Sequence, residues 1–426
     1  LVGVVLLAVL RPLQAVYLAL LLIPLESLSA RFGRGTLGIS ATEGVALIAM
    51  GGWTLHRLLK GGPRLQSPLA APLVLLLVAH IPGLFLAAAP FAVVKELVMW
   101  SAFFVLFLAV VSAEPGSSLR LVKAIAVSGV LVAAVAVEKT GGKPQAVSDL
   151  GGFVNGRATG SFSSPVLLGI FLAITLPLQL LFVFRGSSRW SRIAGLAAVA
   201  LTLLALALTM TRSAFLAVAA ATAWLLVVWR PFRIVGLAIV AAAVALLLSG
   251  LNPAPRIVDL RVLRARVASV AASDTRSAQL RLALWKATPK MIVDNLPWGV
   301  GAKNFDKQAA RYGAVGPGAL PYTHAHDVPL TVAAELGLPG IAALVWILAV
   351  LARLCSRALR ATDADTRALG AVLSAALVAL CVDGVFDYAF GDNAFTFTVV
   401  LVFALVARVG AGARTPALPA AVPLPI

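Results

Sequence analysis

Charged residues and cysteines are both scarce in this 426-residue sequence. Asp, Glu, Lys and Arg make up 12% of the chain, whereas soluble domains carry about 25%. Apolar residues make up 61%, and the mean hydropathy is +0.98. These proportions exclude a soluble enzyme and a disordered chain. The two cysteines, Cys355 and Cys381, lie in or beside apolar runs, so the sequence offers neither a disulfide scaffold nor a cysteine metal site.

Long apolar runs are abundant, and they are continuous rather than alternating. About 20 apolar residues in a helix cross a membrane, whereas the strands of a membrane barrel alternate apolar and polar residues. We therefore predict an all-α polytopic membrane protein with about 12 transmembrane helices. The predicted spans are 12–28, 40–56, 69–88, 91–112, 121–138, 165–184, 193–210, 213–229, 234–250, 328–352, 366–386 and 394–410. Residues 1–10 are too short to cross alone, and their role stays open.

Positive charge alternates between the loops that join these spans. Every second loop is short and basic, so by the positive-inside rule these loops and both termini are expected in the cytoplasm. The basic residues of this set are Arg11, Arg57, Lys60, Arg64, Arg120, Lys123, Arg185, Arg189, Arg192, Arg230, Arg233, Arg353, Arg357, Arg360, Arg367, Arg408 and Arg414. The opposite loop 383–393 has no Lys or Arg and holds Asp383, Asp387 and Asp392. The net charge of +18 therefore predicts contacts with membrane lipids, and we expect no nucleic-acid partner.

One connection is much longer than the others. Residues 251–327 join two predicted spans on the non-cytoplasmic side, and connections of this length are usually functional. Long loops escape the charge rule, so the basic residues in this one do not contradict the topology. Helical patterns at Val262–Val270 and Ser277–Lys290 predict a partly helical loop. The chain is thus divided into residues 1–250 with nine helices, the loop 251–327, and residues 328–426 with three helices and a cytoplasmic tail.

Arg212 lies in a short turn, Thr211 to Ser213, between two apolar spans. One interpretation is a side chain that reaches the lipid headgroups. The other is a fixed cation that faces a phosphate group at membrane level.

His324 and His326 lie just before a span. They are interpreted either as solvated loop histidines or as functional groups. A metal site needs further ligands, and Asp327 is the only carboxylate close in sequence, so we predict no metal. A general base is the better use, since neutral imidazole takes a hydroxyl proton near pH 7.

Five motifs follow one another in the predicted outer segments. Residues 157–162 read Arg-Ala-Thr-Gly-Ser-Phe, and the Thr-Arg-Ser turn follows at 211–213. Arg281 and Trp285 then form Arg-x-x-x-Trp, and Pro-x-Gly-x-Gly-x-x-x-Phe runs over 297–305. The last motif is His326-Asp327, nine residues, and Gly-x-x-Gly at 337–340. Together they resemble the motifs of the O-antigen ligase and polymerase superfamily of bacterial inner-membrane glycan transferases. Asp327 departs from the Asn, Ser or Gln that the family usually has there.

The resemblance implies metal-independent, inverting glycosyl transfer at the periplasmic face of the bacterial inner membrane, with no cofactor. The donor would be a glycan on undecaprenyl diphosphate, and the acceptor a sugar hydroxyl of lipid A-core. The implied catalytic residues are His326 and Arg212. The implied residues for binding the diphosphate and glycan are Arg157, Arg281, His324, Lys303 and Trp285.

Three other functions stay open. A repeat-unit polymerase would use the same donor with another lipid-linked unit as acceptor, and a ligase could serve a different surface glycan. A membrane transporter is the third, but apart from His80 and a few residues at span edges the spans lack the ionisable groups that transporters often place at mid-membrane.

Overall fold

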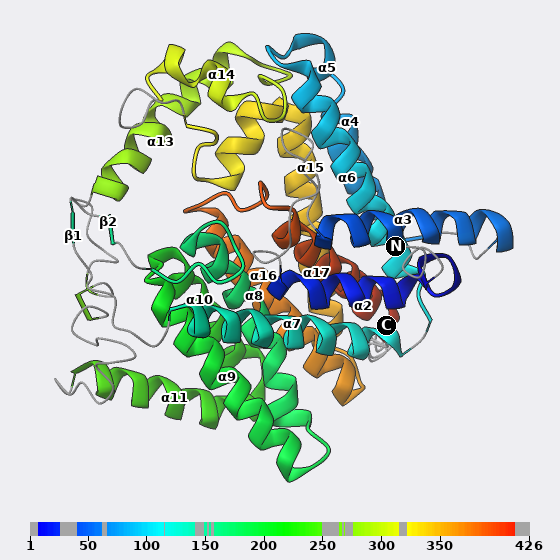
Figure 1. The fold of residues 1–426 in the computed structure, drawn as a ribbon, viewed down its shortest axis with the longest axis vertical. Coiled ribbons are helices and arrows are strands. Elements are labelled where there is room, and N and C mark those ends of the chain that lie inside the picture. The colour runs from blue at the N-terminus through cyan, green and yellow to red at the C-terminus, as the bar shows by residue number, and fades with distance from the viewer. Residues whose placement is uncertain are drawn as a thin grey trace, which may run out of the picture.

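The structure is a computed structural model that is built almost entirely of helices (Figure 1). It describes residues 7–25, 41–61, 66–114, 116–140, 149–150, 153–154, 157–248, 264–265, 268, 276–314 and 322–413. Two short antiparallel strands, β1 (Asp149–Leu150) and β2 (Phe153–Val154), form the sheet that this part of the chain contains. The prediction of a mainly helical protein is confirmed.

The helices follow one another as α2 (Pro12–Leu22), α3 (Ala41–Lys60), α4 (Ala70–Val78), α5 (Gly83–Leu86), α6 (Pro90–Val111), α7 (Ser117–Lys139), α8 (Pro165–Arg185), α9 (Arg189–Thr209), α10 (Arg212–Val228), α11 (Arg230–Leu248), α13 (Arg276–Asp294), α14 (Phe305–Ala309), α15 (Val328–Leu359), α16 (Ala364–Gly384) and α17 (Asn393–Gly412). Short 3-10 turns occupy Ile23–Leu25 and Ala310–Tyr312. Each predicted span overlaps at least one of these helices.

Seven of the described helices are long and apolar enough to cross a membrane, namely α6, α7, α8, α9, α15, α16 and α17. Three further apolar segments, Pro12–Leu25, Ala70–Leu86 and Arg212–Val228, are shorter. The predicted span 69–88 is divided because Pro82 has no backbone N–H with which to continue the hydrogen bonds of α4. The number of 12 spans and the side on which each loop lies stay predictions.

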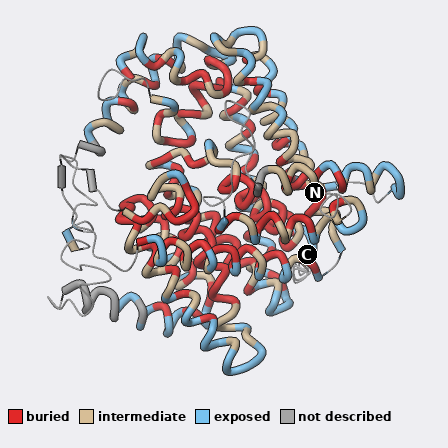
Figure 2. Tube along the Cα trace, in the orientation of Figure 1, coloured by how far each residue is buried: buried red, intermediate tan, exposed pale blue. Residues whose placement is uncertain are grey.

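Helices α8, α16 and α17 form the most buried layer of the molecule (Figure 2). The side chain of Ser164 accepts a hydrogen bond from Leu167 N at the start of α8, and Pro165 follows at the first helical position. Small residues then let the neighbouring helices approach. A Cβ added at Gly169 would lie only 2.9 Å from Ala214 Cβ in α10, so this contact requires glycine.

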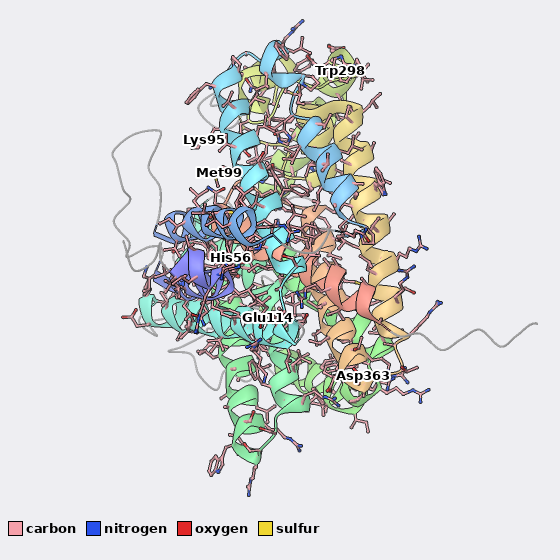
Figure 3. All side chains as sticks on the ribbon, turned by 90° about the vertical axis from the view of Figure 1, so that its right-hand side faces the viewer. His56, Lys95, Met99, Glu114, Trp298 and Asp363 are labelled. Atoms are coloured by element: carbon pink, nitrogen blue, oxygen red, sulfur yellow. The ribbon has the colours of Figure 1, made fainter. Side chains whose placement is uncertain are left out.

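The segment before α15 folds at one end of the molecule, where α13 and α14 lie beside the first turns of α15 (Figure 1). Its own apolar core includes Leu284 and Met291 of α13, Phe305 of α14, and Ala334 of α15. Trp298, in the loop between α13 and α14, lies at the opposite end of the molecule from Asp363, which follows α15 (Figure 3). The predicted helical window Ser277–Lys290 falls on α13. The window Val262–Val270 and the boundary at residue 250 fall mainly outside the described residues.

Candidate functional site

The turn between α9 and α10 is held in place by Arg157. The Nε of Arg157 donates to the carbonyl of Thr209 at 2.7 Å, and its Nη2 donates to Thr211 Oγ1 at 2.7 Å. Met210 takes a left-handed backbone, with φ of 49°, between these two contacts. Arg157 therefore fixes the turn from which Arg212 begins α10.

Arg212 and Arg281 come from different elements, α10 and α13, and lie close enough for the charge of Arg281 to act on Arg212. Arg212 is 9% exposed. Two arginines that repel each other in a partly buried place are well suited to a ligand with several negative charges, because such a ligand relieves the repulsion and accepts bidentate hydrogen bonds. Arg157 contacts Thr211, the residue before Arg212, and Arg212 in turn lies near Arg281. The three arginines predicted from the sequence are therefore neighbours.

His326 is paired with a carboxylate from the loop between α16 and α17. Its Nδ1 lies 3.0 Å from Asp387 Oδ1, and the other carboxylate oxygen lies 3.4 Å from Nη2 of Arg281. The backbone N–H of Tyr388 also donates to Asp387 Oδ1 at 2.8 Å. Asp387 therefore joins the predicted base to one of the predicted arginines.

Asp387 is a carboxylate at neutral pH. Burial by itself would raise its pKa, but the hydrogen bond and charge of His326, with Arg281 and the N–H of Tyr388, lower the pKa to about 2. A carboxylate facing Nδ1 favours the tautomer in which Nδ1 carries the proton. The lone pair of His326 is then on Nε2, which is the nitrogen that accepts a proton in general-base catalysis.

The backbone of His326 is strained, with φ of 52°. Residues outside the ordinary φ range cost about 1–3 kcal/mol and tend to cluster at functional sites. Asp327, the next residue, caps α15 by accepting from Leu330 N at 2.6 Å, a contact that typically contributes ~1 kcal/mol. In the described chain, the other non-glycine residues with positive φ are Met210 and Lys303, and both lie on the loops around this site.

His324 packs directly against His326. Their ring centroids are 4.3 Å apart, and Nδ1 of His324 accepts from the backbone N–H of His326 at 3.2 Å. Burial and the charges of His326, Lys303 and Arg281 together lower the pKa of His324 to about 4, against the opposing effect of Asp387. His324 is therefore neutral near pH 7, and it supports the backbone of the strained His326.

Lys303 and Trp285, the remaining predicted binding residues, have protein partners. Nζ of Lys303 lies 3.8 Å from Glu96 Oε1 in α6, and the charge of Lys303 also acts on the buried Glu335 in α15. Trp285 packs on the apolar core around Phe305, and its indole N–H is buried without a hydrogen-bond partner among the described residues. Lys303 thus lies between carboxylates rather than with the arginines.

The glycine motifs bring the 297–305 loop onto α15. Val300 N donates to Ala334 O at 2.8 Å, and Leu338 N donates to Pro297 O at 2.9 Å. Gly337 has φ of 60° and ψ of −150°, so α15 is kinked there. A Cβ at Gly337 would overlap the carbonyl of Pro297. These glycines are explained by close contact between two backbones.

The family comparison covers most of these elements. Residues 196–345 match the family model described as O-antigen ligase. This match supports membership of the O-antigen ligase superfamily. No curated protein matches the chain. The matched range includes Arg212, Arg281 and His326, whereas Arg157 and Asp387 lie outside it. The match suggests an O-antigen ligase- or polymerase-type function, and together with the apolar helices it supports a multi-pass membrane protein.

An apolar cavity of about 320 Å³ adjoins the site. Its walls come from α4, α6, α15, α16 and α17, and its lining includes Trp100, Val332 and Phe403. Val328, which follows Asp327, and Tyr388, which follows Asp387, connect the cavity to the histidines. The volume is within the range of ligand pockets, ~300–1,000 Å³.

Sequence reasoning missed Asp387, Tyr388, Glu96 and Glu335. One signal was present for Asp387, because the 383–393 loop is acidic and has no Lys or Arg, although a cluster of basic groups lies in other outer segments. Nothing in the sequence pairs this loop with His326. Three of the four, Glu96, Glu335 and Tyr388, line the cavity. Glu335 is one of the nine residues that the last motif leaves unspecified, and the segments of Glu96 and Tyr388 gave no motif.

Proposed function

We propose that this protein is an O-antigen ligase that transfers a glycan from undecaprenyl diphosphate to a sugar hydroxyl of lipid A-core at the periplasmic face of the inner membrane. The observation that carries the proposal is the pairing of His326 with Asp387, 3.0 Å apart, beside Arg281 and Arg212. A base and a cationic group on neighbouring elements are the two requirements of such a transfer.

The reaction follows from these groups. Nε2 of His326 takes the proton of the acceptor hydroxyl as the oxygen forms a bond to the anomeric carbon of the donor sugar. The bond between that carbon and the diphosphate oxygen breaks, and the diphosphate leaves with its electron pair. Arg212 and Arg281 stabilise the charge that develops on it. A single attack from the face opposite the leaving group inverts the anomeric centre.

Arg157 supports this step through the turn. Its contacts to Thr209 and Thr211 fix the start of α10, so that Arg212 has a defined position before the substrate arrives. Donors that are arranged in advance stabilise developing charge without a reorganisation cost. The role of Asp387 is to orient the imidazole and to stabilise the imidazolium formed during transfer, as the acid of a Ser-His-Asp triad does.

The apolar cavity suits the hydrocarbon part of a lipid-linked substrate. Four of the five helices in its wall, α6, α15, α16 and α17, are long and apolar enough to cross a membrane. It begins at Val328 and Tyr388, beside the histidines. A hydrocarbon chain bound there would hold the lipid-linked donor close to His326. Holding the reactants close together in this way lowers the barrier of a bimolecular transfer.

A repeat-unit polymerase, or a ligase of another surface glycan, would use the same groups with a different acceptor. The glycan of a deletion strain separates them. Loss of long chains with polymerised lipid-linked glycan accumulating supports the ligase. Single repeats that remain attached to the core would instead mean a polymerase.

Turnover in detergent separates a transferase from a transporter, because transport requires a sealed vesicle. Purified protein is given lipid-diphosphate-linked glycan and acceptor, and the product is followed by gel mobility. The proposal expects glycan-bearing acceptor from the wild-type protein. Absence of product, with both substrates shown to bind, would contradict it.

A further inference from the structure

We propose that His324, His326 and Asp387 form a binding site for a zinc-class divalent cation, and that the bound cation blocks the site. One ligand atom from each of the three residues lies within 4.8 Å of the other two. Three protein ligands with one position left for water form a common zinc arrangement. In the described chain these residues bring together two histidines and a carboxylate from two separate loops.

The distances are close to those of a zinc site. Ligand atoms at zinc bonds of ~2.0–2.1 Å in a tetrahedron are separated by about 3.3–3.4 Å. His326 Nδ1 and Asp387 Oδ1 are 3.0 Å apart, so this edge needs to open by only a few tenths of an ångström. The ligand atom of His324 lies within 4.8 Å of the other two, so a rotation of its ring would bring it to the tetrahedral spacing.

One of the three ligands already has an outer partner that orients it. Arg281 binds the other oxygen of Asp387, as outer partners that orient metal-binding carboxylates do.

Neighbouring charges oppose a cation but do not prevent its binding. Arg281 and Lys303 both act on His324. Arg281 is balanced by Asp387 at 3.4 Å, and Lys303 is balanced by Glu96 at 3.8 Å. The remaining repulsion favours a cation with strong imidazole affinity, such as Zn²⁺, over Mg²⁺ or Ca²⁺, which prefer oxygen ligands.

The consequence is inhibition, and this part rests on the proposed function. A cation bound by His326 and Asp387 takes the imidazole lone pair or the carboxylate that orients the ring, and His326 then cannot accept the hydroxyl proton. Transfer therefore needs no metal, and it stops when zinc occupies the cluster. This differs from a catalytic zinc site, in which removal of the metal abolishes turnover.

Binding is tested by equilibrium dialysis of the purified, chelator-washed full-length protein against Zn²⁺. We expect one zinc per chain. His324→Ala and Asp387→Asn should each weaken binding by at least ~100-fold, because loss of a direct ligand costs more than the ~10–100-fold typical of an outer partner. His56→Ala is the matched control. His56 Nδ1 is bonded to the carbonyl of Val9, so this variant should bind as the wild type does.

A second readout separates loss of the site from misfolding. Co²⁺ replaces Zn²⁺, and its visible absorption reports tetrahedral nitrogen and oxygen coordination, while size-exclusion elution reports folding. Variants that elute normally and give no cobalt spectrum support the site. Wild-type zinc binding that both folded variants retain in full, or wild-type protein that binds no zinc, overturns the proposal.

The inhibition arm uses single-turnover transfer with and without Zn²⁺. Inhibition that EDTA reverses supports the proposal, whereas zinc binding at the cluster with unchanged turnover overturns the blocking role. Metal-free wild-type protein without any turnover would overturn the proposed function, and the dialysis result would still decide whether the metal site exists.

Discussion

Nδ1 of His326 lies 3.0 Å from Oδ1 of Asp387, although the two residues are 61 positions apart in the chain. The pair connects the segment before α15 to the loop after α16. Through Asp387 it also connects to Arg281, which α13 contributes. The histidine, the carboxylate and the arginine therefore hold one another in position before any substrate is bound.

Asp387→Asn should greatly reduce turnover while leaving substrate binding nearly unchanged. The amide keeps the size of the carboxylate but removes the charge that selects the tautomer of His326 and stabilises its protonated form. We expect a loss of about 10²–10⁴-fold in kcat, the range of general-base catalysis. Single-turnover assays measure this loss. Asp392→Asn is a control from the same loop, because Asp392 caps α17 by accepting from Phe395 N, and Asn preserves such a cap. Equal activity losses in the two variants would contradict the pairing.

Arg212→Lys and Arg281→Lys should both impair transfer. Lysine keeps the charge but not the planar group that binds phosphate through two parallel hydrogen bonds. We expect about 10²-fold losses in turnover, comparable to the loss of one donor to a developing anion. Arg189→Lys serves as the control, since Arg189 is exposed at the start of α9. Normal turnover in both test variants would mean that the arginines do not bind the diphosphate.

Gly337→Ala should separate the 297–305 loop from α15. The φ of 60° and ψ of −150° at Gly337 fall in a region that is essentially restricted to glycine, and the added methyl would overlap the carbonyl of Pro297. A lower melting temperature and reduced turnover are expected, as measured by thermal unfolding in detergent. Gly51→Ala is the control, because nothing lies within 4 Å of a Cβ there, and alanine in a helix interior stabilises by about 0.5–1 kcal/mol. A Gly337→Ala melting temperature equal to that of the wild type would show that the backbone contact is unimportant.

The topology predicts opposite accessibility for the two ends of the molecule. With Cys355 and Cys381 replaced by serine, a cysteine at Lys290 in α13 should react with an impermeant reagent added to intact spheroplasts. A cysteine at Arg189 should react only after the membrane is opened. Labelling of position 290 only after opening would place this part of the 251–327 loop in the cytoplasm and contradict the periplasmic site.

The sequence predicted the positions of the helices more completely than the contacts between them. Continuous apolar runs marked the spans, and the helix that begins at Val328 was expected with His326 near its start. It extends to Leu359 rather than 352 because its last turns carry Arg353 and Arg357, which a hydropathy pattern does not count. Hydropathy also gave no sign of the break near Pro82.

The candidate site was only partly predictable for a related reason. Motifs marked His326, Arg212 and Arg281 within their own segments. Asp387 follows a different helix, and its contact with His326 depends on how α15 and α16 pack, which no local pattern encodes. Lys303 was predicted to bind the substrate. Its Nζ lies 3.8 Å from Glu96 Oε1 in α6, more than 200 residues earlier in the chain, and no local pattern encodes this contact.

The most direct test of the account is single-turnover glycan transfer by purified wild-type protein and His326→Ala, both in EDTA. The account predicts that the wild-type protein transfers glycan without any metal. His326→Ala should lose about 10²–10⁴-fold of the rate and still bind the lipid-linked donor, whereas His324→Ala should lose less because His324 supports the backbone of His326. A near-normal rate for His326→Ala, or a wild-type protein that is inactive in EDTA and recovers when a divalent metal is added, would contradict metal-independent transfer by this base.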